Sequence, residues 1–218
     1  MTTGVIERRR HLRLWLEFTL LYFGIPLAML VSFGLYSLFP VLLALAALAA
    51  FLLMLTPGWR WRELREGGFL RHWRMLLGFT LIAATAIAVL VLTLRPGSFL
   101  AFPRGRPEMW MFVMVAYPIV SALPQELIFR PLFFRRYGVL FPDARVAVAM
   151  NGAVFGFGHL FYQNPIAIGL SFLGGAVIGW AYHRTGSFPL AWALHAIAGM
   201  LIFTLGLNWY FYHGVVPR

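Results

Sequence analysis

Cysteine and lysine are both absent from the 218 residues of this chain. Without cysteine, the chain can form neither a disulfide nor a thiolate nucleophile nor a cysteine-ligated zinc site. Charged residues make up only 11% of the chain and seven residues are acidic, whereas 61% are hydrophobic. A water-soluble domain cannot hide that much apolar surface, so we expect an integral membrane protein whose solvent is the bilayer.

Arginine supplies all the basic side chains, and the net charge is +11 with histidine neutral. A basic excess can indicate nucleic-acid binding, but here the arginines lie in the connectors between apolar stretches. Anionic lipid head groups and the retention of positive charge on the cytoplasmic side explain this placement more simply. We therefore expect membrane lipids among the partners of the chain, and no nucleic acid.

Seven apolar stretches divide the chain, and each approaches the roughly 20 residues that span a hydrocarbon core. Connectors rich in arginine, proline and glycine separate several of them. The stretches cover residues 14–35, 36–55, 75–94, 109–134, 146–162, 166–182 and 190–212. The sequence thus predicts an all-α bundle of about seven transmembrane helices, in a single integral-membrane domain that covers residues 1–218.

The distribution of arginine predicts how this bundle is oriented in the membrane. With the N-terminus in the cytoplasm, the connectors near 57–74, 135–145 and 183–187 lie on the same side, and the first two are basic. The 95–108 connector also carries arginines and fits this orientation less well. The all-arginine, cysteine-free composition suggests a bacterial chain, so we expect a multi-pass protein of the bacterial cytoplasmic membrane.

A few ionisable and polar side chains interrupt the apolar stretches: Gln125, Glu126 and Arg130 in one, His159 in the next, and His195 two stretches later. An ionised side chain at the centre of a bilayer costs about 2.5–3.5 kcal/mol on insertion scales. Glu126 and Arg130 are four residues apart, so on a helix they share one face and the guanidinium can orient the carboxylate. The cost of burying this set favours a functional role for it.

Each of these residues also has a purely structural interpretation. Glu126 and Arg130 can form a buried ion pair that only fixes helix packing, and either His159 or His195 can serve as an interhelical hydrogen-bonding group. Asn151 is expected to satisfy interhelical hydrogen bonds in the same way. The glycines near His159 are expected to let a neighbouring helix approach closely, and they stand at positions 152, 156 and 158.

The combination of a carboxylate with two imidazoles points to hydrolysis within the membrane. If Glu126, His159 and His195 converge, they can activate a water molecule and stabilise the oxyanion that forms at a carbonyl. The same three residues also provide two imidazoles and one carboxylate for a zinc ion with an open fourth position. The chain has no HExxH motif, and the three ligands would come from separate helices, so we expect no cofactor and keep zinc as the alternative.

Three segments of the chain resemble the three motifs of the CPBP (CAAX protease and bacteriocin-processing, or Abi) membrane proteins, which are written EExxxR, FxxxH and HxxxN. They are PQELIFR at 124–130, FGFGHL at 155–160 and GSFPLAWALH at 186–195, in the family's order. The resemblance covers about residues 110–205. It implies an all-helical intramembrane glutamic endopeptidase, in which the first Glu and the His of the second motif activate water. The His and Asn of the third motif then stabilise the oxyanion.

This chain departs from that pattern at two positions, because Gln125 replaces the first Glu and Gly199 replaces the Asn. An amide has no useful basicity near neutral pH, so Gln125 cannot take a proton from water. Position 125 can be an engineered substitution, Glu126 can have taken over as the base, or catalysis can be lost. We favour the second explanation, in which Glu126 and His159 activate water, His195 stabilises the oxyanion, Gln125 assists and Arg130 orients Glu126.

The sequence therefore predicts an intramembrane endopeptidase that cleaves a membrane-associated protein or peptide, near its C-terminus. The alternative is a catalytically silent relative that acts as a membrane binding or immunity module. A transporter of protons or small molecules is a third interpretation, since Glu, Arg and His also mark transport paths, but the chain shows no inverted repeat. Prenylated substrates are not expected for a bacterial chain.

Overall fold

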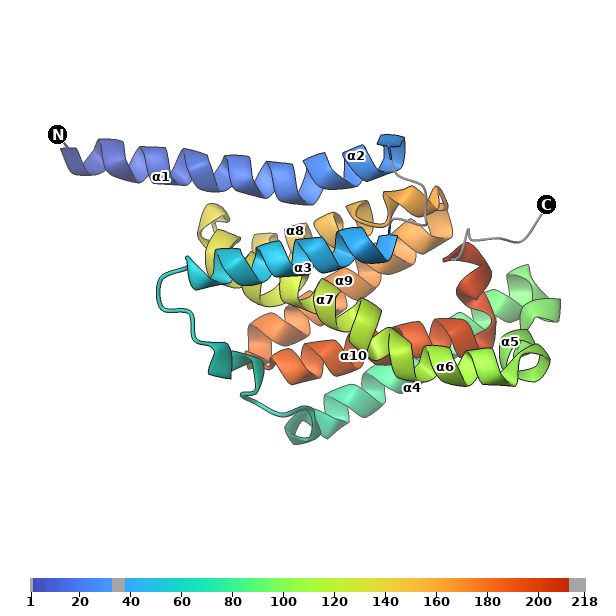
Figure 1. Cartoon of the computed structure of the whole chain (residues 1–218). Coiled ribbons are helices and arrows are strands. Elements are labelled where there is room, and N and C mark those ends of the chain that lie inside the picture. Colours follow the sequence, from blue (N-terminus) through green and yellow to red (C-terminus); the bar gives the residue numbers. More distant parts are fainter. Residues whose placement is uncertain (1, 33–37, 212–218) are drawn as a thin grey trace.

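The computed structural model of the chain describes residues 2–32 and 38–211, and in these residues every regular element is a helix. The prediction of an all-α fold is therefore confirmed. Five helices in the described residues are long and apolar enough to cross a bilayer, judged by length and composition: Glu7–Val31, Phe69–Leu94, Pro107–Leu140, Pro165–Thr185 and Phe188–Leu205. Figure 1 shows that most of the helices lie roughly along one common direction.

The helices follow the apolar stretches of the sequence, and short 3-10 and π-helical segments (η) extend or join them. The α-helices are α1 (Thr2–Thr19), α2 (Ile25–Ser32), α3 (Leu38–Met54), α4 (Trp73–Leu94), α5 (Ala101–Gly105), α6 (Pro107–Tyr117), α7 (Leu123–Leu127), α8 (Ala144–Phe157), α9 (Pro165–Thr185) and α10 (Phe188–Leu205). The η segments are η1 (Leu20–Gly24), η3 (Trp61–Leu64), η4 (Phe69–His72), η5 (Pro96–Ser98), η6 (Pro118–Ala122), η7 (Ile128–Tyr137), η8 (Gly138–Leu140), η9 (Leu160–Tyr162) and η10 (Leu207–Tyr210).

Two of the seven apolar stretches form helices shorter than a membrane span, so the prediction of about seven spans is supported for five. The helix α3 has 17 residues and α8 has 14. At 1.5 Å per residue, α8 is about 21 Å long, whereas the hydrocarbon core of a bilayer is about 30 Å thick. The chain leaves α8 at Gly158, and the carboxamide of Asn164 then accepts hydrogen bonds from Ile166 N and Ala167 N to start α9 at Pro165.

Some predicted boundaries lie outside the described residues. They are the boundary between the first two stretches at 35 and 36, and the end of the seventh stretch at 212.

The helix that carries Gln125 and Glu126 is continuous from Pro107 to Tyr137 but contains two π-helical segments, η6 and η7. Proline occurs at positions 118, 124 and 131, and its ring nitrogen cannot donate the usual helical hydrogen bond. Wider π turns are a common accommodation of such interruptions and occur often at functional sites. Between the two π segments, the single turn of α7 carries Gln125 and Glu126, and Arg130 of the same motif lies in η7.

The basic connectors gather at the end of the molecule where α1 begins (Figure 1). Two contacts tie them together there. Arg135 Nε donates to Glu63 Oε2 at 3.0 Å, and Ser187 Oγ donates to the carbonyl oxygen of Gly67. The connector that contains α5 lies at the opposite end. This arrangement agrees with the predicted grouping of the connectors, whereas which end faces the cytoplasm stays a prediction.

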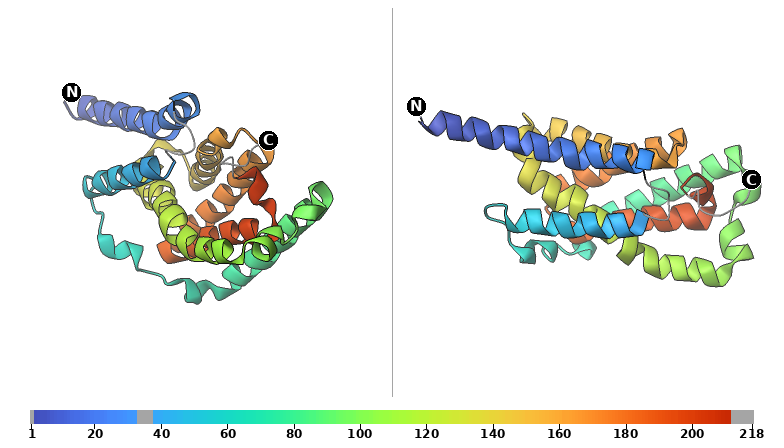
Figure 2. Two further views of the ribbon diagram at one scale, coloured as in Figure 1. Left: turned by 45° about the vertical axis from the view of Figure 1, so that its right-hand side comes forward. Right: turned by 45° about the horizontal axis from the view of Figure 1, so that its top comes forward.

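The glycines of α8 bring it against α9. A Cβ atom at Gly152 would lie 2.8 Å from Ala176 Cβ, and one at Gly156 would lie 3.0 Å from Phe172 Cβ. The predicted close approach of a neighbouring helix is therefore confirmed, and α9 is that helix. Both views in Figure 2 place α1 and α2, drawn in dark blue, along one flank of the bundle. Apolar side chains elsewhere point outward, as Ile82 (73% exposed) and Phe112 (66% exposed) do.

Candidate active site

Glu126 and Arg130 form an ion pair in the interior of the bundle, and both residues are 0% exposed. Arg130 Nε donates to Glu126 Oε2 at 2.8 Å, and Arg130 Nη2 donates to Oε1 at 3.2 Å. The two residues stand on α7 and η7, four positions apart, so the helix presents both on the same face. This two-point contact fixes the plane of the carboxylate.

His195 of α10 is the second partner of this carboxylate. Its Nδ1 lies 2.9 Å from Glu126 Oε1, and it is 6% exposed. Because an ionised carboxylate only accepts hydrogen bonds, Nδ1 carries the hydrogen and Nε2 is left for other partners. Oε1 thus accepts from both His195 and Arg130, and Oε2 accepts from Arg130. Each hydrogen bond that Glu126 accepts therefore comes from the guanidinium of Arg130 or from the imidazole ring of His195.

Asn151 of α8 and the backbone of α9 complete the surroundings of Arg130. Arg130 Nη1 donates to Asn151 Oδ1 and, at 3.3 Å, to the carbonyl oxygen of Gly175. Asn151 Nδ2 in turn donates to the carbonyl oxygen of Phe129 at 2.7 Å. The predicted interhelical role of Asn151 is confirmed. The network joins four helical segments through one buried guanidinium, whose desolvation is offset only when each donor has a partner.

His159 stands where α8 has ended, one residue before η9. Its Nδ1 lies 2.7 Å from the carbonyl oxygen of Phe155. A carbonyl oxygen can only accept, so Nδ1 carries the hydrogen and the Nε2 of the neutral ring has a free lone pair. No hydrogen bond or ion pair joins His159 to Glu126 within the described part of the chain. The ring of Phe155 contacts both imidazoles instead, with centroid distances of 4.8 Å to His159 and 5.3 Å to His195.

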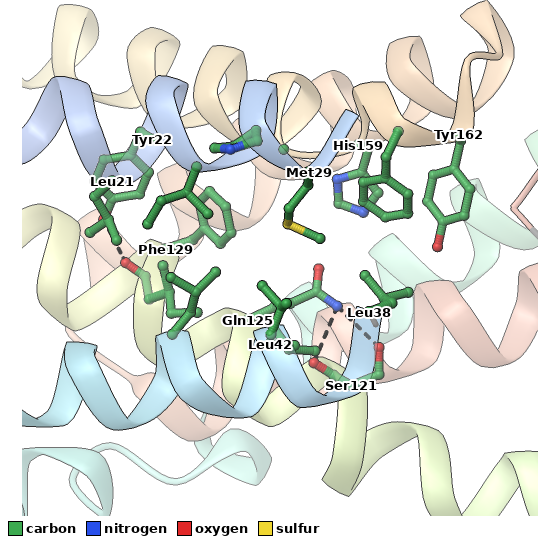
Figure 3. A pocket seen from close by; sticks show the side chains of 17 residues that line it. Leu21, Tyr22, Met29, Leu38, Leu42, Ser121, Gln125, Phe129, His159 and Tyr162 are labelled. Carbon is green, nitrogen blue, oxygen red and sulfur yellow. Dashed lines mark hydrogen bonds between the residues drawn. The ribbon is translucent and has the colours of Figure 1, made fainter. Parts of the chain in front are cut away.

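Gln125 stands beside Glu126 on α7 but faces a different direction. Its Nε2 donates to the carbonyl oxygen of Ser121 at 3.2 Å and to Ser121 Oγ at 3.0 Å. Figure 3 shows these two bonds, with His159 projecting from the wall opposite Gln125. With the amide nitrogen bound in this way, the amide oxygen remains as an acceptor, although it has no basicity to remove a proton.

Two cavities meet at Gln125 and His159. The first, which we call the apolar cavity, contains about 740 Å³ of empty space including its open mouth. Its other walls come from η1, α2, α3, η7 and η9, and carry mainly apolar side chains: Leu21, Tyr22, Ile25, Pro26, Met29, Leu38, Val41, Leu42, Leu45, Ile128, Phe129 and Phe161. It therefore offers an apolar environment next to the two polar groups.

The second cavity, the histidine cavity, contains about 620 Å³ and extends from Gln125 and His159 to His195. Its walls come from α6, α8, α9 and α10, among others. Ser121, Gln125, His159 and Tyr162 line both cavities, so these four residues mark the boundary between them. Glu126 and Arg130 line neither of the two.

The proposed zinc set does not fit these positions well. In the described residues, no group of three or more His, Cys, Asp or Glu side chains is arranged to hold a metal ion. Both oxygens of Glu126 already accept hydrogen bonds from Arg130 and His195. N–H donors thus occupy three of the roughly four lone-pair positions of this carboxylate, and no hydrogen bond or ion pair joins His159 to it in the described residues.

Several residues that line the cavities or contact the motif residues could not be identified from the sequence. Tyr117 lines the histidine cavity, and Ser121 binds Gln125, but neither belongs to a recognisable spacing pattern. The carbonyl oxygen of Gly175 reaches Arg130 only because α9 carries no side chain there, and a Cβ would lie 2.6 Å from Phe155 Cβ. In the sequence, a glycine within an apolar helix indicates that another group can approach the backbone closely, but it does not indicate which residue does so.

Comparison with known families places this site within a defined segment. Residues 107–201 match the family model described as type II CAAX prenyl endopeptidase Rce1-like. The matched segment contains all five predicted site residues, and it confirms the resemblance that the three motifs indicated. No curated protein and no solved structure matches the chain significantly.

Proposed function

We propose that this chain, whose residues 107–201 form a domain of the Rce1-like CAAX endopeptidase family, is an integral membrane endopeptidase. Its substrate is a membrane-associated protein or peptide, cleaved near the C-terminus. The observation that carries the proposal is the histidine cavity, where His159 and His195 approach one space from different helices. A buried carboxylate orients one of them, while the lone pair of the other is free.

In the proposed step, His159 acts as the base and Gln125 positions the water. The water oxygen attacks the carbonyl carbon of the substrate, a C–O bond forms, and one proton moves to His159 Nε2. The electron pair of the carbonyl group moves onto its oxygen, which becomes an oxyanion. When the C–N bond breaks, the amine nitrogen leaves with the proton from His159, and the other product is the carboxylic acid.

His195 is the proposed partner of the oxyanion. In the imidazolium form, both ring nitrogens carry hydrogen, so Nε2–H can donate to the oxyanion while Nδ1–H remains bound to Glu126. The carboxylate compensates the positive charge of that ring. Glu126 then acts through His195, because its burial and its three donors favour positioning over direct contact with water. The earlier assignment of Glu126 as the base stays a prediction.

A catalytically silent relative that binds a membrane peptide is the second candidate function. It is favoured by Gln125, since the amide has no basicity, and by the absence of a side chain at Gly199. The two candidates differ in one observable: only the peptidase creates new chain termini in its host membrane.

The test compares the termini of membrane proteins by mass spectrometry in cells with this chain, with His159→Gln, or without any copy. His11→Gln serves as the control, because His11 is exposed on α1 and lines neither cavity. We expect termini that appear with the unaltered chain and with His11→Gln and that are absent from the other two samples. Identical termini in all samples at equal expression would favour the binding module.

A further inference from the structure

Tyr117 is the last residue of α6, and its side chain lines the histidine cavity. Its ring meets the ring of His195 edge to face, with centroids 6.1 Å apart and an interplanar angle of 72°. Phe203 holds the same ring from another side at 5.6 Å. Two aromatic contacts of this kind fix the orientation of the phenol, so its hydroxyl group has a defined position in the cavity.

Gly199 provides the space that Tyr117 occupies. It lies on α10, four residues after His195, and therefore on the same face of that helix. A Cβ atom at Gly199 would overlap Cε1, Cζ and the hydroxyl oxygen of Tyr117. The phenol ring and a side chain at position 199 thus exclude each other. The hydroxyl group lies against α10, one turn from His195.

The hydroxyl group of Tyr117 makes no hydrogen bond to another residue in the described part of the chain. Tyr117 is half-buried, and its side chain borders the histidine cavity. Here the cavity beside it is where the proposed function places the carbonyl group of the substrate. When the carbonyl oxygen of a substrate occupies this cavity, the hydroxyl group of Tyr117 can donate a hydrogen bond to it.

We propose that Tyr117 is a catalytic residue whose O–H donates to the oxyanion of the substrate together with Nε2–H of His195. The proposal rests on the proposed peptidase function. The phenol keeps its proton throughout and contributes only a hydrogen bond, which strengthens as the carbonyl oxygen becomes negative. In this arrangement α6 supplies the donor, since α10 carries no side chain at Gly199 that can do so.

The test uses Tyr117→Phe, which removes the hydroxyl group and keeps the ring against His195 and Gly199. The substrate is a peptide that spans a cut site found by the comparison of termini, and the enzyme is the full chain in proteoliposomes. We expect kcat to fall by about 10²–10³-fold, the usual loss for one oxyanion donor, with little change in KM or melting temperature. The control is Tyr182→Phe, because Tyr182 is buried and lines neither cavity. We expect the kcat of this control variant to equal that of the unaltered chain.

A second pair of variants moves the donor to α10. Tyr117→Ala opens the space that the ring filled, and Tyr117→Ala combined with Gly199→Asn places an amide donor in it. We expect the double variant to regain at least about tenfold in kcat over Tyr117→Ala, as one charge-assisted hydrogen bond provides.

The outcomes separate this inference from the proposed function. An active unaltered chain with full kcat in Tyr117→Phe overturns the role of Tyr117 and leaves the peptidase standing. A raised KM with unchanged kcat also overturns it, since a contact of that kind is made equally with substrate and transition state. An unaltered chain that cleaves no peptide overturns both.

Discussion

At the scale of single residues, the site depends on one negative charge. Glu126 balances Arg130 and holds His195, and neither member of the ion pair is exposed. The i, i+4 spacing predicted the contact between Glu126 and Arg130. It did not predict that His195 would bind the carboxylate while His159 would not, because this depends on how α8 and α10 are rotated against α7. Local sequence carries little information on such rotations.

Glu126→Gln should reduce the free energy of unfolding by about 3–5 kcal/mol, because it leaves the guanidinium of Arg130 buried without a counter-charge. Equilibrium unfolding of the purified chain in mixed detergent micelles measures this loss. The matched control is Glu66→Gln, which breaks the exposed pair of Glu66 with Arg62 and should cost about 0–1 kcal/mol. Equal effects of the two substitutions would show that the buried pair contributes no more than a surface pair.

At the scale of helices, prolines and glycines shape the site. The apolar stretches predicted where helices occur, and the spacing of Gly152 and Gly156 predicted a close neighbour. The sequence did not reveal that α8 is only 14 residues long, nor that η6 and η7 have π geometry. The predicted apolar stretch continues to residue 162, whereas α8 ends at Phe157 and a short 3-10 turn, η9, follows. Composition alone cannot distinguish a turn built from apolar residues from a continuing helix.

Gly152→Ala should destabilise the bundle by about 1–3 kcal/mol, because the added methyl group would lie 2.8 Å from Ala176 Cβ and force α8 and α9 apart. The matched control is Gly169→Ala on α9, where an added Cβ has no neighbour within 4 Å. Alanine is favoured over glycine in a helix by roughly 0.5–1 kcal/mol, so this variant should be neutral or stabilised. Unfolding in mixed micelles measures both variants, and a stabilised Gly152→Ala would contradict the packing of α8 on α9.

At the scale of the whole molecule, charge is distributed between the two ends of the bundle. The N-terminus and the connectors that contain Glu63 and Asp143 share one end, and α5 lies at the other (Figure 1). The sequence predicted this grouping from the alternation of apolar stretches and arginines. Five of the seven predicted spans form helices of the required length in the described residues, whereas α3 and α8 are shorter there.

The absence of cysteine makes the orientation directly measurable. Arg65→Cys places one thiol in the connector before α4, and Gly97→Cys places one in η5 at the opposite end. If the N-terminus and the connectors near 57–74 and 135–145 lie in the cytoplasm, a membrane-impermeant maleimide should label Gly97→Cys in intact cells and Arg65→Cys only after permeabilisation. The unaltered chain gives the background of the assay, and labelling in the opposite order would reverse the orientation.

His159 is the proposed base that removes the proton from water, and the rate of peptide cleavage by His159→Gln measures this role. Glutamine can replace the hydrogen bond to the Phe155 carbonyl oxygen but cannot accept a proton, so the fold is retained while general-base catalysis is lost. We expect kcat of the purified variant to fall by at least about 10²-fold, with an unchanged melting temperature. A variant that cleaves the peptide at the rate of the unaltered chain would contradict this role of His159.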